Sequence, residues 1–357
     1  MRITATRVLT PSGFVGPAAV VVEGGVTQAV ERVETAPDRT LTPGFVDLQV
    51  NGVDDVDVAA VDPAGFRRVH DLLLATGVTT WCPTIVTAPL DSYATRLEAI
   101  ASFDDPMIAG VHLEGPFLGG KPGAHPTALL RPLDHDWLGA LPGVVRIVTI
   151  APELDGAVEA VRVLVEKGVV VSLGHSSATL EQVTACIDAG ARMITHLFNA
   201  MPPLHHREPG VVGAALTDDR VVAGLIADLV YVHPTAINLA FRAKPRGIAL
   251  VTDAVAWRGA RIGRIEIVHD GTAPRLPDGT LAGSSLTMDA AIRNVVQIAG
   301  VSLEDALVAA STTPAAVAGL DDRGSIEPGR RADLVALDAD LGVETVWLGG
   351  EEVVARS

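Results

Sequence analysis

The sequence predicts an α/β protein: a (β/α)8 barrel of the TIM type, with a small β-sandwich domain formed by the N- and C-terminal segments. Three observations predict this fold. Apolar, β-branched runs alternate with longer Ala- and Leu-rich segments through the middle of the chain, which is typical of βα units and a parallel sheet. Both ends carry short Val-rich runs between Gly, Pro and Asp turns. With 357 residues and 48% hydrophobic content, the chain is long enough for a barrel and one smaller domain.

The barrel is predicted from eight apolar runs, which is the number of strands that closes such a barrel. An open, doubly wound sheet is the alternative architecture, but no glycine fingerprint for a dinucleotide follows an early run. In a barrel the active site lies on the loops after the carboxyl ends of the strands. The predicted strands are 44–50, 78–86, 108–113, 145–150, 169–173, 192–196, 221–227 and 248–252.

Neither terminal segment is long enough to close a core alone, so residues 1–43 and 325–357 are expected to pair into one β-sandwich. Residues 44–324 then form the barrel. Near residues 258–283, DG turns flank alternating residues, which predicts an inserted hairpin in place of a barrel unit.

The composition limits both partners and compartment. The chain has 43 Asp and Glu residues against 27 Lys and Arg, and its net charge of −16 repels nucleic acid and anionic lipid. No apolar run reaches membrane-spanning length, and the first residues lack the apolar stretch of a signal peptide, so a soluble, cytoplasmic protein is expected. Cys82 and Cys186 form no CxxC pair and are interpreted as buried thiols in a reducing compartment.

Four polar residues stand at the carboxyl ends of predicted barrel strands, where a buried strand has no structural need for them. Glu114, His175, His196 and Asp253 are spread along the sequence but converge on one mouth in a closed barrel. Two imidazoles and one carboxylate make a three-ligand site for a divalent ion with an open position for water. Asp253 is interpreted as the base that takes a proton from that water, with a fourth metal ligand or a helix N-cap as the alternatives. Singly, each residue is as well explained by a surface carboxylate or a hydrogen-bonded core histidine.

The chain resembles the N-acetylglucosamine-6-phosphate deacetylases of the amidohydrolase superfamily. The resemblance is carried by LTPGFVDLQVNG, HLEGPFLGGKPGAH, LGHSSAT, THLFNAMPPLHHREPG, LVTDAV, TLAGSSLTMD and SIEPGRRADLVALD, in that order along the chain. It implies the same barrel and terminal sandwich. It also implies that Glu114, His175 and His196 bind the metal and that Asp253 is the catalytic acid and base.

Many amidohydrolases hold a second metal with a His-x-His pair after the first strand, and the resemblance places Gln49 and Asn51 at these positions. They are therefore interpreted as vestigial second-metal positions. Amide side chains are weak ligands for zinc or iron, so one divalent ion per subunit is expected, with zinc favoured and iron or cobalt as alternatives.

The resemblance also implies a set of substrate contacts. His125 is expected near the sugar and the acyl carbonyl, where a donor stabilises the developing oxyanion. Arg207 is expected to bind the sugar phosphate of a neighbouring subunit, which implies a homodimer; its alternative is a surface ion pair with Glu208. The implied substrate-binding residues are Ala124, His125, Asn199, Ala200, Arg207, Tyr231 and Leu281.

Two features depart from the family pattern. Tyr231 stands where the family has a histidine that helps to hold the phosphate, and a phenol brings no positive charge at neutral pH. Asp54 and Asp55 replace a Gly-rich segment and would add negative charge if they faced the mouth. The implied reaction is hydrolysis of N-acetylglucosamine-6-phosphate to glucosamine-6-phosphate and acetate. The alternative is a deacetylase of another acetamido sugar, galactosamine-derived or unphosphorylated.

Two further classes are disfavoured. A cyclic-amide hydrolase or deaminase on this barrel would need a His-x-His pair or a carboxylated lysine, and neither occurs at a predicted strand end. A metal-free interaction protein would be expected to have lost ligands, whereas all four of the site residues are present.

Overall fold

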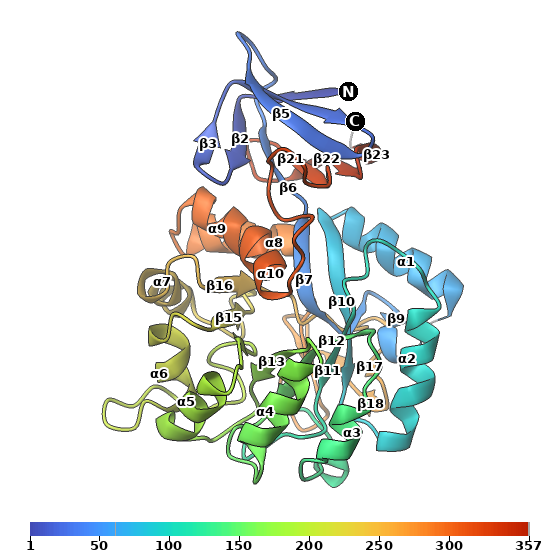
Figure 1. Cartoon of the computed structure of the whole chain (residues 1–357), viewed down its shortest axis with the longest axis vertical. Coiled ribbons are helices and arrows are strands. Elements are labelled where there is room, and N and C mark those ends of the chain that lie inside the picture. Colours follow the sequence, from blue (N-terminus) through green and yellow to red (C-terminus); the bar gives the residue numbers. More distant parts are fainter. Residues whose placement is uncertain (61, 356–357) are drawn as a thin grey trace.

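The computed structural model describes residues 1–60 and 62–355 and shows a barrel with a smaller pair of sheets at one end (Figure 1). Eight strands form one sheet in the order β16-β15-β14-β13-β12-β11-β10-β7, and every neighbouring pair is parallel. This sheet confirms the predicted barrel. Its strands are β7 (Phe45–Val50), β10 (Val78–Val86), β11 (Val111–Glu114), β12 (Val145–Ile150), β13 (Val170–Leu173), β14 (Met193–Ile194), β15 (Val222–Leu225) and β16 (Ile248–Leu250).

The barrel strands are apolar because both of their faces are covered. All nine residues of β10, VTTWCPTIV, are buried, and Trp81 in its middle has no exposed surface. β-branched side chains pack well on such a pleated, enclosed surface, which favours strand over helix for this run. Cys82 in β10 is a free, buried thiol, as is Cys186.

The barrel closes between β7 and the chain that follows β16. The backbone N–H of Asp253 donates to the carbonyl of Gln49 at 2.9 Å. Beside it, the buried carboxylate of Asp47 accepts the Thr252 hydroxyl at 2.6 Å and the Thr252 backbone N–H at 3.2 Å. Side-chain bonds thus replace part of the backbone ladder at this seam.

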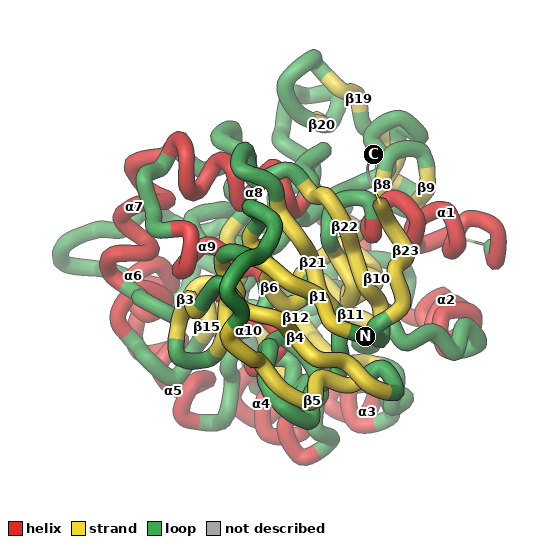
Figure 2. Tube along the Cα trace, turned by 90° about the horizontal axis from the view of Figure 1, so that it is seen from above, coloured by secondary structure: helices red, strands yellow, loops and turns green. Residues whose placement is uncertain are grey.

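Helices surround the barrel strands and alternate with them along the chain; Figure 2 shows them arranged around the periphery. Their ends are set by ordinary capping: Asp62 accepts the backbone N–H of Gly65 at 2.7 Å at the start of the first helix, where Pro63 occupies the first turn. The α-helices are α1 (Pro63–Leu74), α2 (Tyr93–Ala101), α3 (His135–Gly139), α4 (Ala157–Glu166), α5 (Leu180–Asp188), α6 (Gly210–Thr217), α7 (Pro234–Ala243), α8 (Met288–Arg293), α9 (Leu303–Ala310) and α10 (Thr312–Val317). The short helical turns of the described chain are η1 (Val58–Ala60), which precedes α1, and η2 (Leu90–Ser92), η3 (Thr127–Leu129) and the π-helical η4 (Asn294–Ile298), which lie between the α-helices.

Two further sheets form the smaller domain from both ends of the chain (Figure 1). Buried side chains that include Ile3, Val20, Leu41 and Trp347 form one separate apolar cluster between them. The first sheet has the order β1-β4-β5 and the second β23-β22-β21-β6-β2-β3, so β6 pairs antiparallel with β21. Their bounds are β1 (Arg2–Ala5), β2 (Arg7–Thr10), β3 (Gly13–Val15), β4 (Ala18–Glu23), β5 (Val26–Arg32), β6 (Thr40–Pro43), β21 (Leu334–Leu337), β22 (Val343–Leu348) and β23 (Glu351–Ala355).

The segment near residues 258–283 contains two short hairpins where the sequence pattern predicted one. The first pairs β17 (Arg261–Ile262) with β18 (Ile265–Glu266), and the second pairs β19 (Val268–His269) with β20 (Pro274–Arg275). The expected Asp-Gly turn at 270–271 joins only the second pair. Residues 263–264 turn the first one, where Gly263 has a φ of 58°. A further small hairpin, β8 (Gly52–Val53) with β9 (Val56–Asp57), follows β7.

Strand ends differ from the prediction where backbone geometry breaks the apolar run. The run predicted as 108–113 forms a strand over Val111–Glu114 and an isolated parallel bridge from Ile108 to Trp81, and Gly110, with a φ of 123°, lies between the two. Among the helices of the described residues, none has the length and apolar character needed to cross a membrane.

Candidate active site

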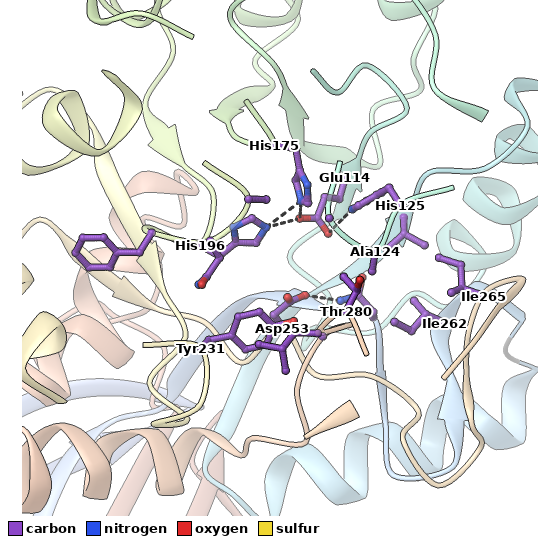
Figure 3. A pocket seen from close by; sticks show the side chains of 18 residues that line it. Glu114, Ala124, His125, His175, His196, Tyr231, Asp253, Ile262, Ile265 and Thr280 are labelled. Carbon is purple, nitrogen blue, oxygen red and sulfur yellow. Dashed lines mark hydrogen bonds and ion pairs between the residues drawn. The ribbon is translucent and has the colours of Figure 1, made fainter. Parts of the chain in front are cut away.

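The four polar residues singled out in the sequence lie together at the carboxyl end of the barrel strands. Glu114 is the last residue of β11, and His175, His196 and Asp253 follow β13, β14 and β16 within three residues. All four are buried, with at most 8% of each residue exposed. They line one cavity of about 320 Å³, and Figure 3 shows Glu114, His175 and His196 pointing toward one another with Asp253 across from them.

Glu114, His175 and His196 form a compact triangle of donor atoms. Glu114 Oε1 lies 3.1 Å from Nε2 of His175 and 3.1 Å from Nε2 of His196, and the two nitrogens are 3.0 Å apart. In a tetrahedral site with metal–nitrogen bonds of about 2.0–2.1 Å, neighbouring donors are about 3.3 Å apart. Two neutral imidazoles that face each other with their lone pairs repel unless a cation lies between them. The donor set and its spacing therefore fit a divalent ion.

The surroundings of these ligands favour their metal-binding forms. His175 Nδ1 lies 3.2 Å from the carbonyl of Lys121; donation to this oxygen leaves Nε2 with its lone pair. Burial acts to raise the pKa of Glu114, but the imidazoles of His175 and His196 beside it outweigh burial and hold that pKa well below its usual range. Glu114 is thus ionised, as a ligand must be.

Three of the four residues have backbone conformations that side chains rarely adopt. The φ angles are 49° at His175, 26° at His196 and 49° at Asp253. Each lies two or three residues past a strand, where the left-handed backbone turns the chain at the mouth of the barrel. Such a conformation costs on the order of 1 kcal/mol per residue and persists where the surroundings over-determine it.

Asp253 is held by two amide side chains. Its Oδ1 accepts a hydrogen bond from Asn51 Nδ2 at 2.7 Å and from Gln49 Nε2 at 3.2 Å, and Gln49 Nε2 also donates to Glu114 Oε1 at 2.9 Å. Burial and the neighbouring negative charge of Glu114 raise the pKa of Asp253 to about 8. Gln49 and Asn51 present N–H groups to the carboxylates, an orientation that leaves them no ligand atom on that side.

His125 lies beside the triangle and stays neutral. Its Nε2 is 3.8 Å from Glu114 Oε2, and its Nδ1 is 2.8 Å from the hydroxyl of Thr87. Burial, with a smaller contribution from His175, lowers the pKa of His125 to about 3. Because Nδ1 also accepts the backbone N–H of Thr87 at 3.4 Å, the ring proton is on Nε2. Sequence reasoning missed Thr87, although its position directly after β10 was a usable signal.

Most of the predicted substrate contacts line the same cavity, and Arg207 does not. Arg207 is exposed, lies 2.8 Å from His206 Nε2 and borders a separate hollow beside the start of α5. Within the described part of the chain, no Lys or Arg lines the active-site cavity. Sequence reasoning also missed an apolar wall made by the β17–β18 hairpin, to which Ile262 and Ile265 belong (Figure 3). The predicted residues that do line the cavity with the four above are Asn51, Ala124, His125, Asn199, Ala200, Tyr231 and Leu281.

The two acidic residues after β7 do not add charge to the cavity. Asp54 pairs with Arg68 at 3.0 Å and with Arg258 at 3.2 Å, and Asp55 pairs with Arg68 at 2.8 Å. Neither of them borders the cavity. Because they are paired with arginines outside the cavity, these carboxylates do not repel an anionic substrate from its lining.

Comparison with known proteins places this site in a family. Residues 40–353 match the model of the amidohydrolase family. The chain is 39% identical to an N-acetylgalactosamine-6-phosphate deacetylase of Escherichia coli O157:H7, over 98% of each chain. It is 43% identical to an N-acetylglucosamine-6-phosphate deacetylase of Bos taurus, over 88% of this chain and 83% of that protein.

Solved structures agree with the sequence relatives. An N-acetylglucosamine-6-phosphate deacetylase of Thermotoga maritima is 35% identical and superposes with a TM-score of 0.93, with all of both chains covered. A mutant of the Mycobacterium smegmatis deacetylase in complex with N-acetyl-D-glucosamine-6-phosphate has the same TM-score of 0.93 over 99% of both chains. Amidohydrolases are metal-dependent, and the Glu114, His175 and His196 cluster is able to bind a metal. On sequence and on structure, the chain belongs to the amidohydrolase family.

Proposed function

We propose that this chain hydrolyses the acetamido group of N-acetylglucosamine-6-phosphate to give glucosamine-6-phosphate and acetate. The single observation that carries the proposal is the buried triangle of Glu114, His175 and His196 with Asp253 across the same cavity. The relatives support it, because deacetylases named for this substrate are 43% and 42% identical to the chain over 88% of its length.

Glu114, His175 and His196 are the residues that would hold one divalent ion, and we propose zinc, with iron or cobalt as the other ions that suit two imidazoles and a carboxylate. When bound, such an ion polarises the acyl carbonyl and makes water a nucleophile near neutral pH. Among the described residues a second ion finds no comparable donor set, since Gln49 and Asn51 turn their N–H groups toward the carboxylates.

Asp253 moves the proton in this proposal. Its carboxylate accepts the proton that the attacking water gives up and delivers it to the sugar nitrogen as the C–N bond breaks, so that the amine leaves neutral. A pKa raised to about 8 by burial and by Glu114 suits a group that must both take and give a proton near neutral pH.

His125 supplies a donor to the carbonyl oxygen. Its Nε2 carries the ring proton, because Nδ1 accepts from the backbone of Thr87, and its lowered pKa keeps it neutral. An N–H group in a buried site stabilises the negative charge that develops on the carbonyl oxygen during attack. Its position, with Nε2 3.8 Å from Glu114 Oε2, supports this role.

The phosphate needs a cation that this cavity does not contain among its described residues. We propose that the chain acts as a homodimer in which Arg207 reaches the active site of the second copy. Its exposure and its contact with only His206 among the described residues support this role, because a guanidinium without an acidic partner is free to bind an anion. Replacing Arg207 by alanine should raise the KM for the phosphorylated sugar and leave the rate on the unphosphorylated sugar unchanged.

Acetate release from N-acetylglucosamine-6-phosphate by the purified, metal-loaded chain tests the main proposal. The matched control is Asp253→Asn, which keeps the triangle and the metal and should lower kcat by a factor of about 100 or more. A native chain that holds one equivalent of metal and releases no acetate from any N-acetylhexosamine-6-phosphate would refute the proposed reaction.

A second substrate is favoured by one specific comparison. The relative that matches 98% of this chain is named for N-acetylgalactosamine-6-phosphate, and Tyr231 stands in the cavity where the resemblance leads one to expect histidine. The two sugars differ only in the orientation of one hydroxyl. Measuring kcat/KM for both phosphorylated sugars, and for both without phosphate, decides between them: the larger value identifies the substrate.

A further inference from the structure

Gln49 and Asn51 alternate along the first barrel strand and its end, so their side chains point to the same face. That face is the mouth of the barrel. Gln49 is 2% exposed and Asn51 is 3% exposed, which is unusual for amide side chains unless they have polar partners. Both find those partners in the carboxylates of the active site.

The two amides converge on one oxygen of Asp253. Oδ1 accepts Asn51 Nδ2 at 2.7 Å and Gln49 Nε2 at 3.2 Å. The backbone N–H of Asp253 also donates to the Gln49 carbonyl at 2.9 Å, so the same strand holds both the main chain and the side chain of this residue. No hydrogen bond from the residues that the structure describes reaches Oδ2, and Asp253 lines the cavity.

The hydrogen bond from Asn51 to Asp253 leaves the other polar atom of the Asn51 amide without a partner in the described structure. Its own Oδ1 is buried and has no hydrogen-bond partner among the described residues. An unpaired buried carbonyl oxygen costs about 1–3 kcal/mol. Turning the amide over would place this oxygen about 2.7 Å from Asp253 Oδ1, where two oxygens repel. The orientation of Asn51 is therefore dictated by the carboxylate of Asp253 and not by the stability of Asn51 itself.

Gln49 has a second partner that adds to this picture. The same Nε2 atom donates one hydrogen to Glu114 Oε1 at 2.9 Å and one to Asp253 Oδ1. Two buried carboxylates in one mouth repel each other, and an amide nitrogen between them offers a hydrogen to each without having an acidic proton of its own to lose. The distance between the proposed metal ligand and the proposed base is thereby fixed by a neutral group.

We propose that Gln49 and Asn51 are positioning residues: they hold the Asp253 carboxylate by Oδ1 and leave Oδ2 as the oxygen that handles the proton. This inference rests on the proposed hydrolysis and deepens it. A carboxylate turns easily about its last side-chain bond, and general acid–base catalysis needs an oxygen within about 2.6–3.2 Å of the proton it moves. Two donors on one oxygen select one rotation.

Asn51→Ala is the principal variant because, in the described structure, the Asn51 side chain bonds only to Asp253. It should lower kcat by about 10–100-fold, the usual effect of removing a group that orients a reacting residue, and leave KM and bound metal within about twofold. Asn238→Ala is the matched control. It removes a hydrogen bond of 2.9 Å from Asn238 Nδ2 to the carbonyl of Ala299, outside the cavity, and should leave kcat unchanged. Gln49→Leu, assayed at saturating metal, keeps the buried volume and should also lower kcat.

A second measurement separates positioning from direct binding of the sugar. The dissociation constant for N-acetylglucosamine-6-phosphate is measured by calorimetry in Asp253→Ala, with and without Asn51→Ala. If Asn51 acts through Asp253, the two constants agree within about twofold, because the residue it acts on is already gone.

The outcomes are distinct. Unchanged kcat in folded Asn51→Ala and Gln49→Leu, with an active native chain, overturns the inference and leaves the proposed function standing. Weaker sugar binding on adding Asn51→Ala to Asp253→Ala also overturns it, because Asn51 would then contact the substrate. A native chain that releases no acetate overturns the proposed function itself, and the inference with it. Should Asn51→Ala fail to fold, Gln49→Leu decides alone.

Discussion

Asp47 lies fully buried in the seam of the barrel. We expect the native chain to lose stability as the pH rises from about 4 to about 7, and we expect Asp47→Asn not to show this loss. Its carboxylate accepts the Thr252 hydroxyl at 2.6 Å and the backbone N–H groups of Thr252 and Gln49 at 3.2 Å. Burial outweighs these three bonds and raises the pKa of Asp47 from 3.8 to about 6.

The sign and size follow from the two pKa values. Between 3.8 and about 6, the folded chain keeps a proton on Asp47 that the unfolded chain has released, so the free energy of unfolding falls as the pH rises. The stability that Asp47 contributes is fully present below pH 3.8, the pKa in the unfolded chain, and is lost above about pH 6, the pKa in the folded chain. With about 1.4 kcal/mol for each pKa unit, the loss is about 3 kcal/mol. Asparagine does not ionise, and the Thr252 hydroxyl can turn to accept a hydrogen from its amide.

Urea denaturation of the native chain and of Asp47→Asn, at several values between about pH 4 and about pH 8, measures this effect. Both are studied at the same metal concentration, so that the contribution of the metal cancels in the difference. The free energy of unfolding of the variant relative to the native chain should rise by about 3 kcal/mol across the range. A difference that stays constant with pH would show that Asp47 is already ionised in the folded chain and would refute the reasoning.

Three further outcomes are expected. Glu114→Gln should lose most of its tightly held divalent metal, measured by elemental analysis after dialysis, because it removes the only charged ligand; full metal content in this variant would contradict the ligand set. Chelation should lower the Tm of the native chain, and zinc at about 100 times its Kd should restore about 2.7 kcal/mol; an unchanged Tm would argue against a metal in the folded state. Gly77→Ala should destabilise by about 2 kcal/mol or more in urea, since Gly77 has a φ of 84° and a Cβ there would lie 2.6 Å from the Phe45 ring. Gly24→Ala, with a φ of 59° and nothing within 4 Å, should cost less; equal losses would show that the contact is relieved without effect.

The eight barrel strands were predictable because a parallel sheet with covered faces requires continuous apolar runs, and such runs are visible in a single sequence. Their ends were less predictable. The run that includes Arg192–His196 forms a strand only over Met193–Ile194, because His196 leaves it with a φ of 26°. The strand predicted to reach Thr252 ends at Leu250, because the Thr252 N–H bonds to the side chain of Asp47 and not to a neighbouring strand. Neither the φ of His196 nor the hydrogen bond of Thr252 can be predicted from the pattern of hydrophobic residues.

The candidate site was found in sequence for a topological reason. Polar residues that end apolar strands must meet when the strands form one barrel, so Glu114, His175, His196 and Asp253 could be selected without knowing any distance. The apolar wall was not predictable, because Ile262 and Ile265 face the cavity only through the fold of a short hairpin. The partners of Gln49 and Asn51 were also hidden, since the rotation of an amide is set by three-dimensional neighbours.

The pairing of β6 with β21 has a consequence for how the chain folds during its synthesis. Pro43 lies opposite Leu334, so the entire barrel is synthesised between two strands that are neighbours in one sheet. On the ribosome, the barrel strands meet partners that emerge soon after them, whereas β6 keeps an open edge until β21 has been synthesised. The sandwich is therefore completed after all the barrel strands have been synthesised, and a ribosome that stalls before β21 carries an incomplete sheet with an exposed edge that chaperones can shield.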